Sequence, residues 1–552
     1  MAAAPLCFLD KGETLSEPFY YNPDVARFQV LLEEVTRAKP GSPESRFIRP
    51  EGEVVDRLSS RFHHVLYGRR GTGKSSLLRH IEADLRTQGR LVAWADQETF
   101  KALSYPDVLV GALAEIFAQF AVQLAEKYPE ASKRRLRIRR SMPSPEQMLV
   151  RQLNLAVASL LDLKKAPSES DVEWTESYSS EMQDALESSL SLGTSIDGVK
   201  LGGSRSKSRT SKRTRGGEVA HRYKASKSEH LERALTSYRA LMKAIGAVAP
   251  DSYIILDDFY HLRTTDQPSI AGYFHRAVKD TNVWLKFGSI SLWTRLYAGG
   301  SPPTGLQAPH DVRELSLDRG LQQFAGSKRF LEKILGTLAS EVGVQVNRLF
   351  SDGALDRLVL ASGGVPRDYI GLVSEAVAAA KNRGPSSKAG SERVIAEDVN
   401  TAAGRTVDTK FNDMQEDAGG ESSELQKLVV DLTNHCRTSN SASFLVNTND
   451  VALIDQVNRL QNMRFVHSIA TNETLPNQQS DRYNVYVLDV SQLAAQRAWQ
   501  VDFMGWTKRE GRRARKLVYP PFAGRQAPVD SPSTDIGEIA QDDDRAIVEI
   551  VE

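Results

Sequence analysis

The first two thirds of the chain alternate between short apolar runs and longer stretches of helical periodicity. Apolar runs of this length, rich in β-branched and aromatic residues, predict buried strands, and they cover residues 61–67, 90–96, 251–258, 283–293 and 312–317. Stretches with apolar residues on one helical face lie between them, at 75–86, 105–128 and 228–245. Strands that alternate with helices predict an α/β fold with a parallel sheet covered on both faces.

The pattern changes after about residue 318, where helices predominate. Helical spacing is present over 321–338 and 353–360, and again after the turn at 361–368. Further helices are expected at 397–415, 422–433 and 451–460. They precede a predicted hairpin of strands 465–469 and 483–490, joined by a polar loop at 471–481.

A glycine-rich motif lies between the first predicted strand and the helix that follows it. Residues 68–75 fit G-x-x-x-x-G-K-[ST], in which glycines let backbone N–H groups surround phosphate oxygens. The lysine reaches the outer phosphates, and the serine hydroxyl joins a Mg²⁺ shell. A fortuitous glycine turn is the alternative, but the order strand, loop, helix favours nucleotide binding. The phosphate-binding residues would be Gly68, Arg69, Arg70, Gly71, Thr72, Gly73, Lys74, Ser75 and Ser76.

Two carboxylates end the apolar strand at 251–258. Asp257 is the expected Mg²⁺ ligand together with Ser75, and Asp258 is expected to polarise the attacking water, with Lys74 as the second catalytic residue. The alternative is a strand that ends in a polar turn, where Asp pairs are common.

Three further residues are candidates for contacts with the nucleotide. Ser289, near the end of the next strand, would lie beside the γ-phosphate, and Arg295 would add positive charge. Gly363-Gly364-Val365-Pro366-Arg367 suits a helix stop followed by a new helix. That turn is either an ordinary corner or a device that brings Arg367 to the nucleotide.

The order of these motifs resembles the AAA+/STAND group of P-loop ATPases, and is most similar to the branch of origin-recognition and archaeal initiator ATPases. The resemblance implies ATP and Mg²⁺ as cofactors, a helical lid in which Arg367 touches the phosphates, and a C-terminal winged helix. AAA+ proteins usually carry Asp-Glu where this chain has Asp257-Asp258, so hydrolysis is expected to be slow. No arginine finger is evident in the sequence.

The resemblance and the patterns together divide the chain into six parts. They are an N-terminal arm (1–50), a P-loop ATPase domain (51–318) with a flexible basic insertion at about 130–228, a helical lid (319–385), a connecting helix and linker (386–421), a winged-helix domain (422–520), and a disordered acidic tail (521–552).

Composition narrows the function classes. The chain has 552 residues, a net charge of +1, 40% hydrophobic residues and two cysteines, Cys7 and Cys436. These values exclude a disulfide framework or a zinc module and suit a reducing compartment. Without a secretory signal or an uninterrupted apolar run of about eighteen residues, a cytoplasmic location and no membrane are expected.

Local basic runs point to duplex DNA as a partner. They lie at 133–140, 202–217 and 508–516, and basic runs of this kind are either phosphate contacts or solvated segments. In a DNA-binding winged helix, Arg459 and Arg464 approach the major groove and Arg482 touches the backbone. The leading prediction is therefore an ATP-dependent switch that binds duplex DNA. The alternatives are a signalling ATPase that assembles on ATP binding, with the winged helix making protein contacts, and a nucleotide-binding scaffold with negligible hydrolysis.

Overall fold

The centre of the protein is a five-stranded parallel sheet. The computed structural model describes residues 18–36, 46–50, 52–129, 144–166, 169–174, 221–384, 392–475, 478–492 and 517–521. The strand order is β2-β5-β6-β1-β9, so β1 lies between β6 and β9. The strands span His64–Tyr67 (β1), Val92–Asp96 (β2), Ser252–Asp257 (β5), Val283–Ser289 (β6) and Arg313–Ser316 (β9). This sheet confirms the predicted α/β fold.

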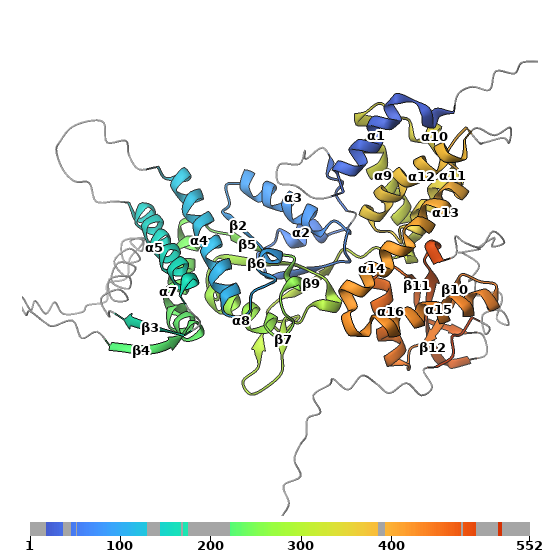
Figure 1. Ribbon diagram of the computed structural model, residues 1–552. Coiled ribbons are helices and arrows are strands. Elements are labelled where there is room, and N and C mark those ends of the chain that lie inside the picture. The colour runs from blue at the N-terminus through green and yellow to red at the C-terminus, as the bar shows by residue number, and fades with distance from the viewer. Residues whose placement is uncertain are drawn as a thin grey trace, which may run out of the picture.

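Alternate residues of the strands face two separate apolar layers. Val65, Ile254 and Leu285 pack with one set of helices, whereas Leu66 and Ile255 pack with another. The first layer holds α4 (Asp107–Lys127), α7 (Lys227–Val248) and α8 (Gln267–Val278). The second holds α2 (Val54–Leu58) and α3 (Lys74–Thr87). Helices therefore cover both faces of the sheet (Figure 1).

Helix α4 is apolar and long enough to pass a simple test for a membrane span. Its apolar side chains, however, are buried among the strands and helices of the first layer. It therefore belongs to the core of the sheet domain.

The expected flexible insertion contains ordered structure. Helix α5 (Pro145–Lys165) starts with a capping box of Ser144 and Gln147, and its leucines pack against α4. Strands β3 (Glu169–Trp174) and β4 (His221–Ser226) form an antiparallel pair directly before α7. The prediction was wrong for these segments because a strongly basic neighbourhood hid the apolar stripe of α5. The basic runs at 133–140 and 202–217 lie outside the described residues.

The predicted arm and lid form one helical unit, which also includes a helix from the predicted connecting segment 386–421. Its helices are α1 (Pro23–Glu34), α9 (Phe324–Glu341), α10 (Val346–Leu349), α11 (Asp352–Ala361), α12 (Pro366–Arg383) and α13 (Ala396–Arg405). Helix α1 contacts α12 and α9, so the arm packs on the lid.

The C-terminal part differs in detail from the expected pattern. It contains α14 (Val407–Ala418), α15 (Ser422–Ser439), β10 (Ser443–Asn447), α16 (Val451–Asn462), β11 (Val466–Leu475) and β12 (Gln478–Leu488). Strand β10 was not predicted, and it pairs with β12 in a sheet of order β10-β12-β11. The predicted polar loop at 471–481 is mostly the paired tip of β11 and β12. Strand β10 lies between α15 and α16, so these two helices are not joined by a short turn, and α16 alone lies between β10 and β11.

Short elements complete the described chain. They are η1 (Phe19–Tyr21), η3 (Gln97–Phe100), η4 (Phe259–His261), η5 (Ser291–Trp293), β7 (Tyr297–Ala298), β8 (Thr304–Gly305), η6 (Leu321–Gln323), η7 (Gly419–Glu421) and η8 (Val490–Gln492).

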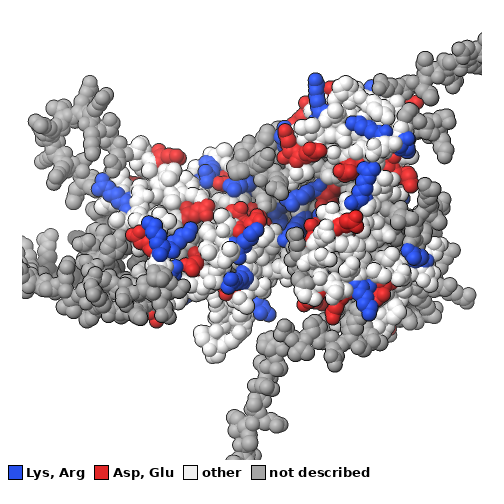
Figure 2. All heavy atoms as spheres, in the orientation of Figure 1, with Lys and Arg blue, Asp and Glu red and all other residues white. Residues whose placement is uncertain are grey.

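The lid and the C-terminal part share one hydrophobic core. A single cluster of buried residues runs from α1 through the lid into β10, β11, β12 and α16. The molecule therefore has two halves, the sheet with its helices and the lid with the C-terminal part (Figure 1). Acidic and basic side chains are interspersed over the face in Figure 2, and several basic ones lie in the crease between the halves.

Candidate functional site

The glycine-rich loop joins the carboxyl end of β1 to the start of α3, as the sequence predicts. Gly71 and Gly73 have φ of +83° and +93°, a backbone conformation that residues other than glycine rarely adopt. At Gly68, a Cβ atom would lie 2.5 Å from the hydroxyl oxygen of Thr72. The Thr72 hydroxyl donates to the Arg69 carbonyl at 2.9 Å, which closes the loop on itself. The backbone thus has the compact turn that a phosphate-binding loop requires.

Lys74 lies inside this turn. Its Nζ donates to the carbonyls of Gly68 at 2.8 Å and Arg69 at 3.3 Å. Burial lowers the pKa of Lys74, and the nearby carboxylates of Asp258 and Asp257 raise it. The ammonium is therefore held at the loop, facing the two acids that the sequence singled out.

Asp257 and Ser75, the two residues expected to hold Mg²⁺, lie side by side. Asp257 is 3% exposed, and the backbone N–H of Asp258 donates to its Oδ1 at 2.9 Å. Burial and the neighbouring Asp258 raise the pKa of Asp257 to about 7, whereas a hydrogen bond with Ser75 opposes that rise. At Gly288 of β6, a Cβ atom would lie 2.3 Å from Oδ1 of Asp257, so the strand leaves room for this carboxylate. A hydroxyl and a carboxylate side by side suit Mg²⁺, which prefers oxygen ligands.

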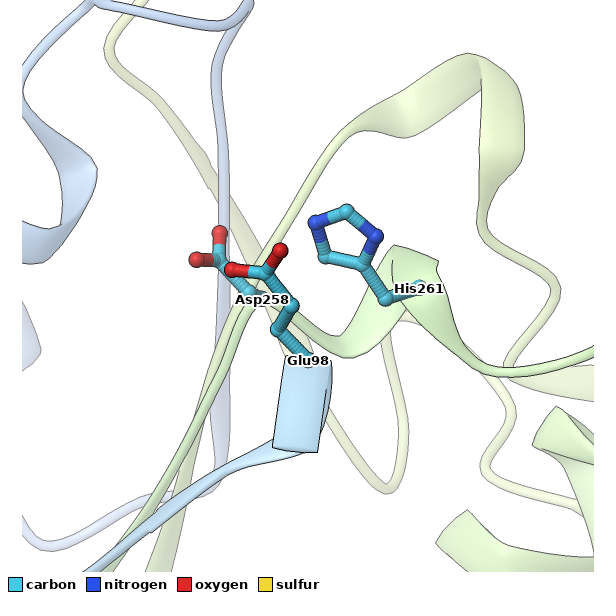
Figure 3. A group of neighbouring side chains, drawn as sticks. All are labelled: Glu98, Asp258 and His261. Atoms are coloured by element: carbon cyan, nitrogen blue, oxygen red, sulfur yellow. The ribbon is translucent and has the colours of Figure 1, made fainter. Parts of the chain in front are cut away.

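Asp258 belongs to a cluster with two residues that the sequence reading missed. Oxygens of Glu98 and Asp258 and a ring nitrogen of His261 lie within 4.8 Å of one another. Figure 3 shows the Glu98 carboxylate, from η3, between Asp258, at the end of β5, and His261, from η4. Burial raises the pKa of Asp258, and Lys74 and His261 counteract it. Glu98 follows β2, the neighbour of β5, so only the strand order brings these acids together.

Arg69 and Arg367 attach the lid to the loop. The backbone N–H of Arg69 donates to Asp318 at 2.8 Å, and its buried guanidinium donates to the Gly363 carbonyl at 3.1 Å. The backbone N–H of Arg367 donates to the Gly71 carbonyl at 3.2 Å, whereas its Nε donates to the Thr36 carbonyl. The side chain of Arg69 thus faces the lid.

The other predicted contacts lie at the same edge of the sheet in different settings. Ser289 is fully buried, shares a hydrogen bond of 2.5 Å with the Thr294 hydroxyl, and accepts the N–H of Gly68 through its carbonyl. Ser76 and Arg295 are exposed.

Arg70 is held by two aromatic rings. Its guanidinium carbon lies 5.2 Å from the ring centre of Trp293 and 5.7 Å from that of Tyr260. Tyr260 lies two residues after Asp258, and the Lys74 ammonium lies 5.8 Å from its ring centre. We call the rings of Tyr260 and Trp293 the aromatic platform. Its signal in the sequence was an aromatic residue shortly after each of the strands β5 and β6.

A separate cavity of about 500 Å³ lies between the segment 46–50 and α9. It is lined by Ile48, Arg49, Arg329, Phe330, Glu332 and Lys333. No residue of the glycine-rich loop is among its lining residues.

The basic residues assigned to a DNA-facing helix are engaged within the protein. Arg464 bonds Asp368 of α12 at 2.8 Å and Asp413 of α14 at 2.9 Å. Arg459 pairs with Glu421 and Asp455. The expectation that Arg464 reaches a groove is therefore wrong, because two carboxylates hold it against the lid. Arg482, on the hairpin, is exposed, and the run at 508–516 lies outside the described residues.

No family model and no curated protein match the chain. Among solved structures, the chain is similar to the ORC1 protein of Aeropyrum pernix in complex with DNA. That match has 15% identity and a TM-score of 0.34, and it covers 84% of this chain and 94% of that one. A likeness of this size says nothing about the function or partners of this chain.

Proposed function

We propose that the protein binds ATP with Mg²⁺ and hydrolyses it slowly, as a switch between nucleotide states. One observation carries the proposal, namely that Lys74, Ser75 and Asp257 converge at the carboxyl edge of the sheet. Open parallel sheets bind ligands at this edge, where neighbouring strands connect in different directions.

Each side chain has a distinct role in this proposal. Ser75 and Asp257 would hold Mg²⁺, which neutralises charge on the phosphates when it is bound. Lys74 would exchange its bonds to loop carbonyls for phosphate oxygens. Asp258, beside Glu98, would orient water and accept its proton while the water oxygen bonds the γ-phosphorus. The bond to the bridging oxygen breaks, its electron pair remains on ADP, and inorganic phosphate leaves.

The lid would respond to the occupied loop. Gly71 lies directly against it, because a Cβ atom there would come within 2.8 Å of Arg367 Cβ. A loop that reshapes around phosphates therefore displaces the start of α12, and α12 shares a core with the C-terminal part.

Binding of a fluorescent ATP analogue and phosphate release test the proposal. Lys74→Ala is expected to weaken binding at least tenfold, and Asp257→Asn to abolish its Mg²⁺ dependence. Lys243→Ala, at an exposed lysine of α7, is the control. Equal affinity in wild type and Lys74→Ala would refute nucleotide binding at this loop.

Duplex DNA is the partner that we propose from the basic runs and from the exposed Arg482. Fluorescence anisotropy with labelled duplex in ATP, ADP and no nucleotide tests it. Affinity should fall with salt, with a log–log slope of about 0.9 for each neutralised phosphate. Binding that is insensitive to salt, or absent in every state, would exclude DNA.

ATP-driven assembly is the second candidate function. The ion pairs of Arg459 and Arg464 favour it, because they commit α16 and its following turn to contacts within the protein. Light scattering with ATP and with ADP distinguishes the two: assembly in ATP without DNA affinity would favour this candidate.

A further inference from the structure

Arg70 is the loop residue whose side chain extends over the carboxyl edge of the sheet. Arg69, the preceding residue, turns its guanidinium to the lid, where it meets the Gly363 carbonyl. Arg70 instead lies against Trp293 and Tyr260. The two adjacent arginines therefore serve opposite sides of the loop.

The aromatic platform comes from the segments that follow β5 and β6, two neighbouring strands on the same side of β1. Tyr260 belongs to η4, which follows β5 and Asp258, and Trp293 belongs to η5, which follows β6. Their ring centres are 6.1 Å apart, with planes inclined by 37°. Guanidinium groups stack well on aromatic faces, and such contacts fix a side chain without neutralising its charge.

This position places a permanent cation beside the reacting groups. Lys74 approaches the same Tyr260 ring, and Asp258 and His261 are close enough for their charges to act on Tyr260 or on Arg70. Burial lowers the pKa of Lys74, whereas a guanidinium stays charged at any physiological pH. Arg70 thus brings a dependable positive charge to the edge where the γ-phosphate of ATP would lie.

We infer that Arg70 is the catalytic arginine of this protein and acts within its own chain. This inference rests on the proposed ATPase function. Its guanidinium contacts the γ-phosphate as the bond from water oxygen to phosphorus forms and the bond to the bridging oxygen breaks. It stabilises the charge that gathers on the phosphoryl and bridging oxygens, and it transfers no proton. Tyr260 and Trp293 are positioning residues that keep it there.

Other described arginines near the loop are less suited to this role. Arg69 is committed to Asp318 and the lid, and the Nε of Arg367 donates to Thr36. Arg295 is exposed, although its backbone N–H is anchored by Gln267.

The test compares Arg70→Ala, Arg70→Lys and the control Arg263→Ala in the full-length protein; Arg263 is exposed. Single-turnover hydrolysis and the affinities for ATP and ADP analogues are measured in parallel. Arg70→Ala should lower the hydrolysis rate about a thousandfold, the lower end for arginine fingers, with ADP affinity within about twofold of wild type. Arg70→Lys should recover little, because an ammonium lacks the planar fork.

Two further measurements separate this role from a structural one. Added guanidinium chloride at millimolar concentration should restore part of the activity of Arg70→Ala and none of that of Lys74→Ala. Trapping of ADP with fluoroaluminate should occur in wild type and in the control Arg263→Ala. It should fail in Arg70→Ala and in Tyr260→Ala, which removes both the ring and the hydrogen bond that Tyr260 shares with Arg70. The rate per molecule should not change on dilution, as expected for an arginine supplied in cis.

Unchanged hydrolysis and trapping in Arg70→Ala, or a wild type that neither hydrolyses ATP nor traps ADP–fluoroaluminate, would overturn the inference. A rate per molecule that falls on dilution would assign the charge to a neighbouring copy instead. If the wild type does not bind nucleotide at all, the ATPase proposal itself is refuted. The binding comparison between wild type and Lys74→Ala detects that outcome separately.

Discussion

A lysine is buried completely in the middle of the central sheet. Lys286 of β6 is 0% exposed, and its Nζ donates to the carbonyls of Ser60 at 2.8 Å and Phe62 at 2.7 Å. Burial holds its pKa well below the usual value. The side chain thus satisfies backbone acceptors just before β1, at the end of the strands opposite to the glycine-rich loop.

Lys286→Met should lower the free energy of unfolding by about 2–4 kcal/mol, because the carbonyls of Ser60 and Phe62 lose their buried donor. Urea unfolding followed by fluorescence measures the change. Lys279→Met, at an exposed lysine, should stay within about 0.5 kcal/mol of wild type. Equal stability of both variants would show that the buried bonds contribute nothing net.

Two histidines at the same end of the sheet make stability depend on pH. Burial, with positive neighbours that include Lys286, lowers the pKa of both His63 and His64 to about 3. Below about pH 6.5 the two histidines bind protons in the unfolded chain but stay neutral in the folded chain. The free energy of unfolding therefore falls as pH falls toward 3. The slope is at most about 1.4 kcal/mol per pH unit for each histidine, and less where water screens the ring.

Urea midpoints at pH 7.5 and pH 5.0 check this dependence. Replacing both histidines by glutamine should flatten the difference between the two midpoints. His310→Gln, at an exposed histidine, should preserve it. The other charged groups around the pair are His275, Asp311, Arg57 and Arg313, and they remain in every variant. A wild type that is equally stable at both pH values would contradict the prediction.

Individual site residues differ in how far the sequence could reveal them. Lys74 and Ser75 could be predicted from the spacing of the motif, because a single turn and the start of the next helix determine where both residues lie. Glu98, Tyr260 and Trp293 join the site only through the strand order, which local patterns do not specify. The direction of Arg464 depended on Asp368, nearly a hundred residues earlier in the chain.

At the level of elements, the turn that precedes lid helix α12 packs directly against strand β11. Gly363 has φ of +57°, and a Cβ atom there would lie 2.2 Å from the ring of His467. The His467 ring in turn bonds Asp489 at 2.8 Å, and Asp489 pairs with Lys410 at 2.6 Å. Since Arg69 bonds the Gly363 carbonyl, this turn touches the glycine-rich loop and the C-terminal sheet at once.

Gly363→Ala should destabilise the protein by about 2–4 kcal/mol, combining overpacking with a left-handed backbone. Faster proteolysis of the C-terminal part should accompany the loss. Gly353→Ala is the matched control, because a Cβ atom there meets nothing within 4 Å. If both variants resist protease as well as wild type does, the close contact between Gly363 and His467 does not stabilise the C-terminal part.

Elements themselves were predictable where their own periodicity was strong. The central strands and α3, α4 and α7 were expected from the sequence, whereas β10 was missed because five residues between two helices carry little periodic signal. Helix α5 was missed although its leucines recur at helical spacing, because the basic segments around it dominated the local composition. A winged helix remains a prediction, since only α16 separates β10 from β11.

At the level of the whole molecule, Arg464 ties three parts of the chain together. It follows α16 and bonds one carboxylate from the lid helix α12 and one from α14. Asp368, its lid partner, directly follows Arg367, the residue whose backbone meets the loop. In the proposed switch, a shift at the start of α12 would be passed through this ion pair to the C-terminal part.

Arg464→Ala should cost about 3 kcal/mol, because it leaves two partly buried carboxylates without their cation. Hydrogen exchange should speed up in β11 and β12, and a double-mutant cycle with Asp368→Ala should show coupling. Arg459→Ala, which removes more exposed ion pairs, should cost less than about 1 kcal/mol. Additive effects of Arg464 and Asp368 would mean that this pair does not link the lid to the C-terminal part.

The paired strands β3 and β4 offer a use beyond the natural chain. Their register sets Trp174 opposite His221, so the two ends of the stretch 175–220 are adjacent. Loop closure depends only weakly on loop length, by about 0.6 kcal/mol for each doubling. A fluorescent reporter with neighbouring termini can therefore be spliced in place of 175–220, or a tight hairpin turn substituted. The first would report on motion beside the sheet in living cells, and the second would give a minimal version of the protein suited to crystallisation.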